Sequence, residues 1–325
     1  MPAFSGSGGV GLSGVGGVLP QRRLTLAELA DAGCLTSTPE ALSSFGFERA
    51  YICGPEDSVC SLALAAGRAA LDDAGLASAD IDVVIWASAR PENHLRPPDD
   101  GTSASPFMDG FRYASGWLQE ALGLHDAEVM AVAQQGCSTM FAALRIARSL
   151  LLAEPRRRHV LCIGVDRLPA ESPREILYNV ISDAACAVVV SRDCERDRWV
   201  GDRHISRGYY WDPVARRHEI VAAYFPTAKT LIERLLSDHG LSPSDVDVVV
   251  PTGVNRESWR ILMRLVGIPT DRFYIDLPSF GHTMTSDNFL YLQAMRASGC
   301  VPAGARLLLF TYGFGSSWSA ILLEH

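Results

Sequence analysis

The chain has 325 residues, of which 48% are hydrophobic, and its mean hydropathy is +0.10. A chain of this length can bury a large core, most simply as two fused units. The net charge of −8 argues against nucleic acid and anionic membrane as partners, and no apolar run is expected to reach the roughly 18 residues of a membrane span. The eight cysteines include no CxxC pair and no metal-ligand spacing with histidine, which predicts reduced thiols, no metal and a cytoplasmic location.

The first part of the chain is predicted to alternate between strands and helices. A strand is expected over residues 10–18. Helices are expected over residues 26–32, 39–44 and 58–74. A buried strand follows at 82–87, and then a polar loop with four prolines at 91–106, a kind of loop that usually covers a site or an interface. A helix over 111–122 leads to a short strand that begins at Glu128.

Later segments continue this alternation. After the central strand a long Ala/Leu-rich helix extends to Leu151, and strands are expected over 160–165 and 184–191. The charged connection 192–199 is the best boundary, so we divide the chain into an N-terminal half, 1–198, and a C-terminal half, 199–325. Beyond it we expect a helix over 228–239, a helix running to Val266 and a strand over 307–311.

An internal repeat relates the two halves. Residues 75–85, Gly-Leu-Ala-Ser-Ala-Asp-Ile-Asp-Val-Val-Ile, recur as residues 240–250, Gly-Leu-Ser-Pro-Ser-Asp-Val-Asp-Val-Val-Val. Later in each half a Gly-marked turn opens a helix, with Cys137 in the first turn and His282 in the second. This shared order indicates duplication. Two equivalent turns around a pseudo-two-fold axis would face each other, so we expect the Cys137 sulfur and the His282 ring within about 4 Å.

Cys137 is the first candidate for a reactive group. It stands at the start of the Ala/Leu-rich helix, where the first helical N–H groups have no intrahelical partner. Those donors and the helix dipole stabilise a thiolate, which is the nucleophilic form of cysteine. The alternative is a small hydrophobic residue buried in the core, and the local sequence leaves both interpretations open.

The whole chain resembles the thiolase superfamily, most closely its β-ketoacyl-ACP synthase III group. The resemblance is carried by residues 11–20, 64–85, Ser182-Asp-Ala-Ala-Cys-Ala-Val-Val and Tyr312-Gly-Phe-Gly-Ser-Ser-Trp, in family order. It implies a thiolase-like, five-layered αβαβα fold of two duplicated halves, a homodimer and no permanently bound cofactor. It also implies a cysteine, matched by Cys137, that takes an acyl group from a thioester, and an oxyanion hole made by the N–H groups of Cys137 and of the turn around Phe314.

Two positions depart from the condensing enzymes of this family. Their Pro-His-Gln-Ala-Asn motif reads Pro-Thr-Gly-Val-Asn here, so Thr252 replaces the catalytic His, and their Gly-Asn motif ends in His282. The His/Asn pair stabilises the enolate that forms when a malonyl extender loses carbon dioxide. A single His suits acyl transfer instead, because His282 can deprotonate Cys137 or later the acceptor. A family branch that acylates hydroxyls or amines is similar, with its His in this position; the alternative for His282 is a satisfied core histidine.

Two neighbours of this pair have equally open interpretations. Asp287 is the nearest acid in sequence to His282, and it is either the carboxylate that orients the imidazole or a helix-surface carboxylate. The acyltransferase branch resembles the first case in pairing its His with an Asp. Thr252 either hydrogen-bonds His282 or an acceptor, or is a strand-end hydroxyl.

Arg256, Arg260 and Arg264 recur at a spacing of four and predict one basic stripe along a helix. Related enzymes use this helix to bind an acidic acyl carrier protein or the phosphates of CoA; the alternative is a solvated face. The family's tryptophan that clamps the CoA adenine has no counterpart between Thr36 and Tyr51, which favours an acyl carrier protein thioester, carried on phosphopantetheine, over acyl-CoA as donor.

The sequence thus predicts an acyltransferase of secondary metabolism that works through a Cys137 acyl-enzyme and transfers the acyl group to a small-molecule hydroxyl or amine. One alternative is a decarboxylative condensing enzyme of the β-ketoacyl-ACP synthase III type. Another, of a different class, is a non-catalytic partner subunit of a thiolase-fold heterodimer. Retention of the Cys, a His and the Gly-rich oxyanion turn argues against the latter.

Overall fold

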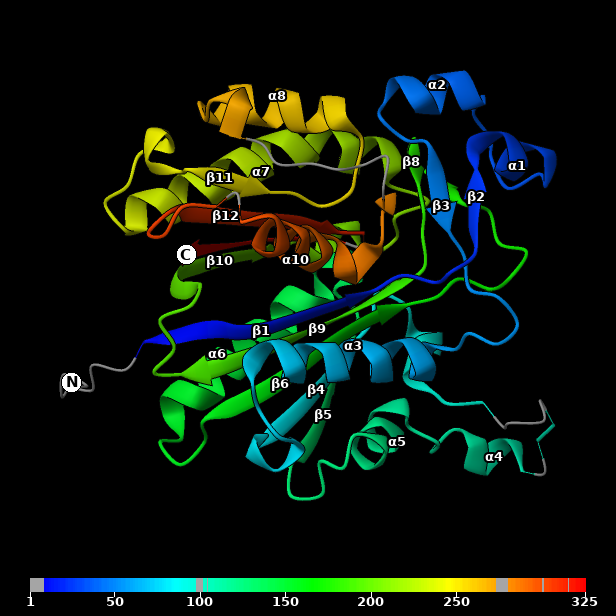
Figure 1. The fold of residues 1–325 in the computed structure, drawn as a ribbon. Coiled ribbons are helices and arrows are strands. Elements are labelled where there is room, and N and C mark those ends of the chain that lie inside the picture. Colours follow the sequence, from blue (N-terminus) through cyan, green and yellow to red (C-terminus); the bar gives the residue numbers. More distant parts are fainter. Residues whose placement is uncertain (1–8, 98–101, 104, 273–279, 300, 315) are drawn as a thin grey trace.

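The computed structural model describes residues 9–97, 102–103, 105–272, 280–299, 301–314 and 316–325. Within these residues the main sheet has nine strands in the order β11-β12-β13-β10-β1-β9-β6-β4-β5 (Figure 1). The strands are β1 (Val10–Val18), β4 (Val83–Ala87), β5 (Glu128–Val132), β6 (His159–Asp166), β9 (Ala184–Arg192), β10 (Arg198–Ser206), β11 (Val248–Val250), β12 (Arg306–Gly313) and β13 (Ser317–Glu324). Two small two-stranded sheets pair β2 (Arg23–Thr25) with β3 (Arg49–Tyr51), and β7 (Glu175–Ile176) with β8 (Asn179–Val180).

The order of the strands separates the two parts of the chain. Strands β1, β4, β5, β6 and β9 form one end of the sheet, and β10 to β13 form the other. The two groups meet where β1 pairs with β10 at Gly11 and Arg198. In each group the parallel pairs lie at the outer end of the sheet: β4 is parallel to β5 and β6, and β11 is parallel to β12. The pairs nearer the centre, β6–β9, β9–β1, β12–β13 and β13–β10, are antiparallel.

Helices form three layers around these two groups of strands. The α-helices are α1 (Leu26–Asp31), α2 (Pro39–Ser44), α3 (Val59–Ala74), α4 (Pro106–Asp109), α5 (Ala114–Ala121), α6 (Thr139–Ala153), α7 (Arg217–Asp238), α8 (Arg256–Val266) and α10 (Asp287–Ser298). Short 3₁₀ turns are η1 (Ser78–Asp80), η2 (Pro91–His94), η3 (Gly136–Ser138), η4 (Gly208–Tyr210), η5 (Pro243–Asp245), η6 (Thr270–Arg272) and η7 (Met284–Ser286).

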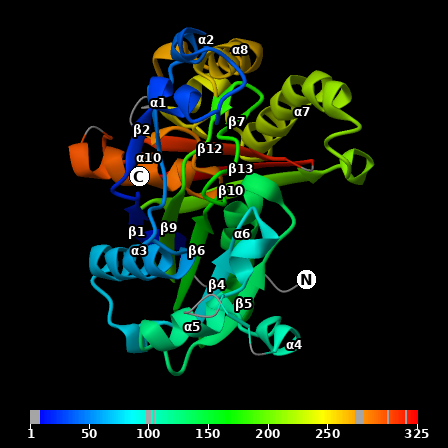
Figure 2. The same ribbon diagram turned by 90° about the vertical axis from the view of Figure 1, so that its right-hand side faces the viewer.

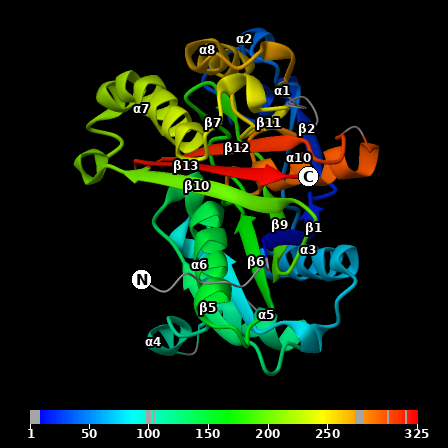
Figure 3. The same ribbon diagram turned by 90° about the vertical axis from the view of Figure 1, so that its left-hand side faces the viewer.

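The layers follow from the hydrophobic cores. Helices α3 and α5 cover the outer face of the β1 group, and α7 and α8 cover the outer face of the β10 group (Figures 1 and 2). Helices α6 and α10 lie between the two groups, where Phe141 and Phe289 have ring centroids 5.8 Å apart (Figure 3). The expected five-layered αβαβα arrangement is therefore confirmed.

The internal repeat has the same local structure in both halves. Helices α3 and α7 are each followed by a glycine in the left-handed conformation, Gly75 with φ 66° and Gly240 with φ 67°. A 3₁₀ turn comes next, and its last residue, Asp80 or Asp245, accepts a hydrogen bond of 2.8 Å from the backbone N–H three residues earlier. The buried strand β4 or β11 then begins. The same sequence pattern thus forms the same capped connection twice.

Two predicted helices begin elsewhere in the structure. Helix α7 begins at Arg217, eleven residues before the expected start at 228, and Pro226 lies inside it. Because a proline lacks an N–H donor, it usually marks the start of a helix or a break in one. The start of this helix was therefore predicted after Pro226 and not before it. The helix expected over 111–122 begins at Ala114, after the separate short helix α4.

The sequence was expected to contain no apolar run long enough to span a membrane, but one segment does reach that length. The 18-residue segment Gly136–Ala153 has a mean hydropathy of 1.2, so its length and composition would suffice for a membrane span. In the structure it forms η3 and α6 in the central layer, and half of the segment is buried. Its apolar character is explained by contacts with both groups of strands.

Candidate active site

Cys137 lies in η3, between β5 and α6, on a turn that fits closely against the β12–β13 connection. Gly136 has φ 53°, and a Cβ there would lie 2.6 Å from the backbone nitrogen and oxygen of Phe314. A Cβ on Gly313 would lie 1.8 Å from the carbonyl oxygen of Gln135. Only glycine fits at either position. The two glycines therefore bring the Phe314 N–H beside the turn that carries the Cys137 thiol.

Hydroxyl groups fix this turn further. Ser138 and Ser317 both donate to the carbonyl oxygen of Gln135, each at 2.8 Å, and their own oxygens are 2.5 Å apart. Ser138 is fully buried and Ser317 is 4% exposed. Buried, satisfied hydrogen bonds of this kind limit the turn to one conformation. Cys137 itself remains half-buried at the surface of a cavity.

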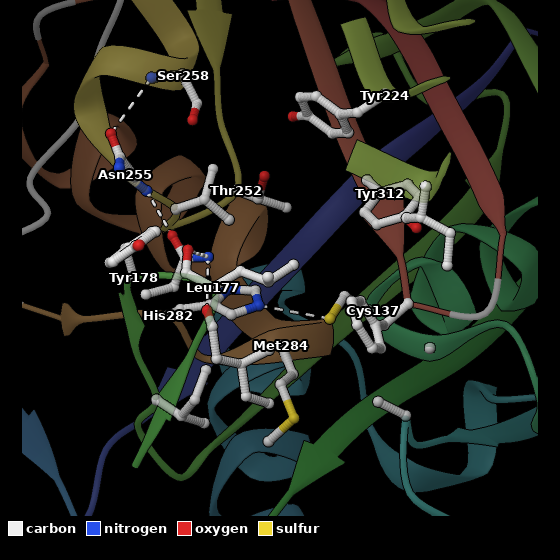
Figure 4. Close-up of a pocket in the computed structure, with 18 of the residues that line it drawn as sticks. Cys137, Leu177, Tyr178, Tyr224, Thr252, Asn255, Ser258, His282, Met284 and Tyr312 are labelled. Carbon is white, nitrogen blue, oxygen red and sulfur yellow. Dashed lines mark hydrogen bonds between the residues drawn. The ribbon is translucent and has the colours of Figure 1, made fainter. Parts of the chain in front are cut away.

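His282 approaches Cys137 from the opposite half of the molecule. Its backbone N–H donates to the carbonyl of Val180 at 2.8 Å, and its carbonyl accepts from the N–H of Ser182 at 2.9 Å. The loop before η7 is thereby attached to β8. The His282 Nε2 atom lies 3.5 Å from the Cys137 sulfur (Figure 4). The distance expected from the repeat is confirmed.

Asp287, the first residue of α10, holds the other side of the His282 ring. Its Oδ2 atom is 2.6 Å from His282 Nδ1, and its Oδ1 atom accepts from the N–H and hydroxyl of Thr283 at 2.5 and 2.7 Å. Asp287 is only 1% exposed, so the alternative of a helix-surface carboxylate is wrong. Because an ionised carboxylate only accepts, Nδ1 carries a proton and Nε2 faces the thiol.

The electrostatics of the site favour a charged imidazole. Burial alone would lower the pKa of His282, which is 8% exposed. The negative charges of Asp287 and Cys137, together with hydrogen bonds to both, outweigh burial and raise the pKa of His282 well above 6.5. The free site therefore favours an imidazolium that faces the sulfur. His282 is thus a buried histidine whose ring nitrogens are both engaged, and one of the two partners is the Cys137 sulfur.

Thr252 lines the same cavity but does not hold the His282 ring. It is 2% exposed, and both ring nitrogens of His282 are engaged by Cys137 and Asp287. The next residue, Gly253, is closely packed, since a Cβ there would lie 2.3 Å from the carbonyl oxygen of Gly281. A contact between Thr252 and an acceptor stays a prediction.

A cavity of about 490 Å³ surrounds the Cys137–His282 pair. Most of its lining is apolar. The lining side chains from outside the predicted site include Ile176, Leu177 and Tyr178 of the β7–β8 hairpin and Ile220, Val221, Tyr224 and Phe225 of α7. Neither group was expected from the sequence. The helical spacing of Ile220 and Tyr224 was a usable signal, but the misplaced start of α7 concealed it.

The predicted basic stripe is less uniform than its spacing suggests. Arg260 and Arg264 are exposed on α8, and Arg260 forms an ion pair with Glu257. Arg256 is half-buried, and its Nε atom lies 3.2 Å from the position of a Cβ on Gly46. Two of the three arginines are thus accessible to a partner. Donor binding by this face stays a prediction.

Two family models match this chain, and the matches decide which family it belongs to. Residues 133–208 match the family model of 3-oxoacyl-[acyl-carrier-protein (ACP)] synthase III, and residues 236–325 match the model of its C-terminal part. Together the matches cover about half of the chain. The chain belongs to the 3-oxoacyl-[acyl-carrier-protein] synthase III family. It is accordingly an enzyme of a family that carries out acyl transfer or condensation.

Individual relatives agree over nearly the whole length. The β-ketoacyl-[acyl-carrier-protein] synthase III of Rhizorhabdus wittichii is 27% identical over an alignment of 331 positions, which covers 96% of this chain and 98% of the relative. The synthase III structure from Aquifex aeolicus VF5 has a TM-score of 0.82 at 22% identity, covering 98% and 100% of the two chains. The structure of the acyltransferase ChlB3 has a TM-score of 0.81 at 20% identity, covering 97% of each chain. The structural likenesses establish the thiolase-like fold alone.

Proposed function

We propose that the protein is an acyltransferase. It takes an acyl group from an acyl carrier protein or CoA thioester onto Cys137 and transfers it to the hydroxyl or amine of a small acceptor. The observation that carries this proposal is the arrangement of Cys137, His282 and Asp287, in which the imidazole contacts the sulfur through Nε2 at 3.5 Å and the orienting carboxylate through Nδ1 at 2.6 Å. Such a set supports nucleophilic catalysis in two half-reactions.

In the first half-reaction the Cys137 thiolate attacks the thioester carbonyl carbon of the donor. The carbon–sulfur bond of the donor breaks as the new bond to Cys137 Sγ forms. The departing thiolate takes the proton from His282 Nε2 and leaves as a free thiol. His282 becomes neutral, and acylation also removes the Cys137 charge, one of the causes that raise the pKa of His282. Neutral imidazole is then ready to act as a base.

In the second half-reaction the acceptor replaces the departed thiol beside His282. Nε2 takes the proton of the acceptor hydroxyl or amine while its oxygen or nitrogen bonds to the acyl carbon. The bond between that carbon and Cys137 Sγ then breaks, which restores the thiolate and the imidazolium. Each half-reaction passes through a tetrahedral oxyanion, and the N–H groups of Cys137 and Phe314 are proposed to bind it. The close contact between Gly136 and the Phe314 backbone supports that role.

Thr252 is the main reason to favour transfer over condensation. Decarboxylative condensation requires a donor that stabilises an enolate, and the condensing enzymes that the chain resembles use a His in the Thr252 position. A neutral hydroxyl supplies no such charge, and His282 already serves Cys137. The runner-up remains a condensing enzyme, a function that the name of the Rhizorhabdus relative supports.

One experiment separates the two functions. The acyl-enzyme is supplied with a malonyl carrier protein in one tube and with hydroxyl and amine acceptors in another, and released carbon dioxide and product masses are followed. Malonyl-dependent extension should be at least about 10²–10³-fold slower than in a synthase with the His, because one stabilising donor is missing. Rapid carbon dioxide release with a β-ketoacyl product would instead establish the condensing enzyme.

The donor and the setting complete the proposal. Arg260 and Arg264 are exposed and suit an acidic acyl carrier protein, so this carrier is the proposed donor partner. The acceptor chemistry fits natural product biosynthesis rather than fatty acid extension. The seven cysteines in the described residues are all free, which is compatible with the reducing cytoplasm predicted from the sequence.

We also propose a homodimer, supported by an exposed apolar cluster. Phe107, Met108, Phe111 and Tyr113, in and after α4, are each more than half exposed, and the rings of Phe107 and Phe111 are in edge contact. Exposed clusters of this kind usually mark an interface. Replacing Phe107 and Phe111 by serine should convert a dimer into monomers in sedimentation experiments, whereas Ile146→Ser, an exposed apolar residue on α6, should not. A wild-type monomer would refute the dimer.

A further inference from the structure

The turn between His282 and Asp287 does not follow from local preferences. This turn, η7, contains Met284 with φ 56°, a left-handed conformation that a bulky side chain adopts only where its surroundings enforce it. The hydrogen bonds of Asp287 fix the imidazole within its own turn, but they do not fix that turn relative to Cys137 in the other half of the chain. The backbone bonds between His282 and β8 hold the start of the turn. A second contact from the N-terminal half holds its middle.

That contact is made by the carboxylate of Asp166, the last residue of β6. The Asp166 side chain is completely buried. Its Oδ2 atom accepts from the hydroxyl and the N–H of Thr285 at 2.6 and 3.2 Å. Its Oδ1 atom accepts from the Ser88 hydroxyl at 2.7 Å and from the Ala89 N–H at 2.9 Å. Four hydrogen bonds thus join the ends of β4 and β6 to the centre of η7.

The burial of Asp166 makes this connection specific. A carboxylate that leaves water must be compensated by hydrogen-bond donors, and no lysine or arginine among the described residues forms an ion pair with it. Burial raises the pKa of Asp166, because the hydrogen bonds from Thr285, Ser88 and Ala89 only partly offset the lost hydration. The donors reach the carboxylate together only when all three segments lie in one arrangement. Any displacement of η7 therefore leaves a buried polar group without a partner.

The end of β6 supports the turn of Cys137 as well. A Cβ on Gly164 would lie 3.1 Å from the Thr285 hydroxyl and 3.4 Å from the Met140 sulfur, so a side chain there would crowd both. Met140 is the second residue of α6, the helix that follows the turn of Cys137. Both turns rest on the same stretch of β6. The position of His282 relative to the thiol therefore depends on how Thr285 sits on this strand.

The contact between Cys137 and His282 is sensitive to this placement. Hydrogen bonds weaken steeply with distance and angle, and a misplacement of about 1 Å can cost about 10²-fold in rate. We propose that Asp166 is a positioning residue, which through Thr285 holds η7 so that His282 Nε2 faces the Cys137 sulfur. This inference rests on the proposed acyl transfer and deepens it. Asp166 is not among the residues that line the cavity, so its effect reaches both half-reactions through His282.

Thr285→Val tests this role, because it removes the hydroxyl contact with Asp166 and keeps the shape of the side chain. The measurement is the alkylation of Cys137 by iodoacetamide, followed at that peptide by mass spectrometry. Only the thiolate reacts, so the ratio of the rate at pH 6 to the rate at pH 9 reports how well the imidazolium stabilises it. We expect this ratio to fall about tenfold, the low end of what a hydrogen bond to a charged group contributes. In turnover, kcat should fall by a similar factor while the donor KM stays within about twofold.

Three further variants isolate the contact. Thr285→Ser keeps the hydroxyl and should keep the alkylation ratio within about twofold of the wild type. Thr311→Val removes a completely buried hydroxyl of β12 that has no hydrogen-bond partner within the described residues, and it should leave the ratio and kcat unchanged. Asp166→Asn alters the contact from the other side, since its amide presents an N–H group where the carboxylate accepted one. It should lower the ratio at least as much as Thr285→Val.

The outcomes separate the positioning role from the proposed function. An unchanged ratio in a Thr285→Val variant that folds, or an equal fall in Thr311→Val, would refute the role of Asp166 whether or not Asp166→Asn folds. A fall in Thr285→Ser as large as in Thr285→Val would refute it too. A wild-type protein that transfers acyl groups to no acceptor, although Thr285→Val lowers the alkylation ratio as expected, would overturn the proposed function and leave the positioning role of Asp166 in place.

Discussion

Replacing Cys137 by alanine is expected to abolish acyl-enzyme formation and to lower turnover by about 10⁴-fold or more, the usual loss when a nucleophile is removed. The wild-type protein, incubated with a suitable acyl carrier protein or acyl-CoA thioester, should gain one acyl mass per chain. Intact-mass spectrometry measures both results. Because Cys137 is half-buried at the cavity surface, the smaller side chain should change Tm little.

A control variant at a second cysteine distinguishes a nucleophilic thiol from one that is merely accessible. Cys34 is a free, half-buried thiol outside the cavity, so Cys34→Ala should acylate like the wild type. Labelling that persists in Cys137→Ala would mean that another group accepts the acyl chain. Labelling lost in both variants would indicate general damage to the fold rather than loss of one nucleophile.

The sequence could predict the centre of this site because the information is local and repeated. The pattern of residues 75–85 recurs at 240–250, and each Gly-marked turn opens a helix in the central layer. Equivalent turns in duplicated halves face each other, so the proximity of Cys137 and His282 followed from their positions. The pairing of Asp287 was open because five residues of separation fit both a buried and an exposed carboxylate.

The walls of the cavity could not be predicted in the same way. The β7–β8 hairpin has two-residue strands and a turn whose residues, Leu177 and Tyr178, contradict the usual turn preferences. Tertiary contacts of Asn179 and Phe45 enforce that turn, and local sequence carries no sign of them. Helix α7 continues through Pro226 for a similar reason, since packing on the β10 group compensates for the missing donor.

Asp287→Asn is expected to lower transfer to the acceptor by about 10³–10⁴-fold. The Asp287 carboxylate, 2.6 Å from His282 Nδ1, keeps a proton on that nitrogen. His282 Nε2, 3.5 Å from the Cys137 sulfur, is left free to accept a proton. An asparagine amide group can donate to Nδ1 and reverse this arrangement. It also lacks the charge that helps to stabilise the imidazolium once Nε2 has taken the proton of the acceptor.

The pH dependence should change in a defined direction. The charge of Asp287 raises the pKa of His282, and the neutral imidazole is the base, so transfer increases as pH rises through that pKa. Without the carboxylate the pKa of His282 falls, and the acidic limb of the transfer profile should move to lower pH. Asp238→Asn, which removes an exposed ion-paired carboxylate at the end of α7, should leave the limb in place.

Stability should follow the same linkage. His282 has a folded-state pKa above its unfolded value near 6.5, so its protonation stabilises the fold fully below that pH, and the contribution is lost as pH rises through the raised pKa. Asp287→Asn removes most of this contribution. The difference in Tm between wild type and variant should therefore be largest at acidic pH and narrow as pH increases. An Asp287→Asn variant with the wild-type transfer rate, the same acidic limb of the pH profile and the same Tm would show that Asp287 neither orients the His282 ring nor raises its pKa.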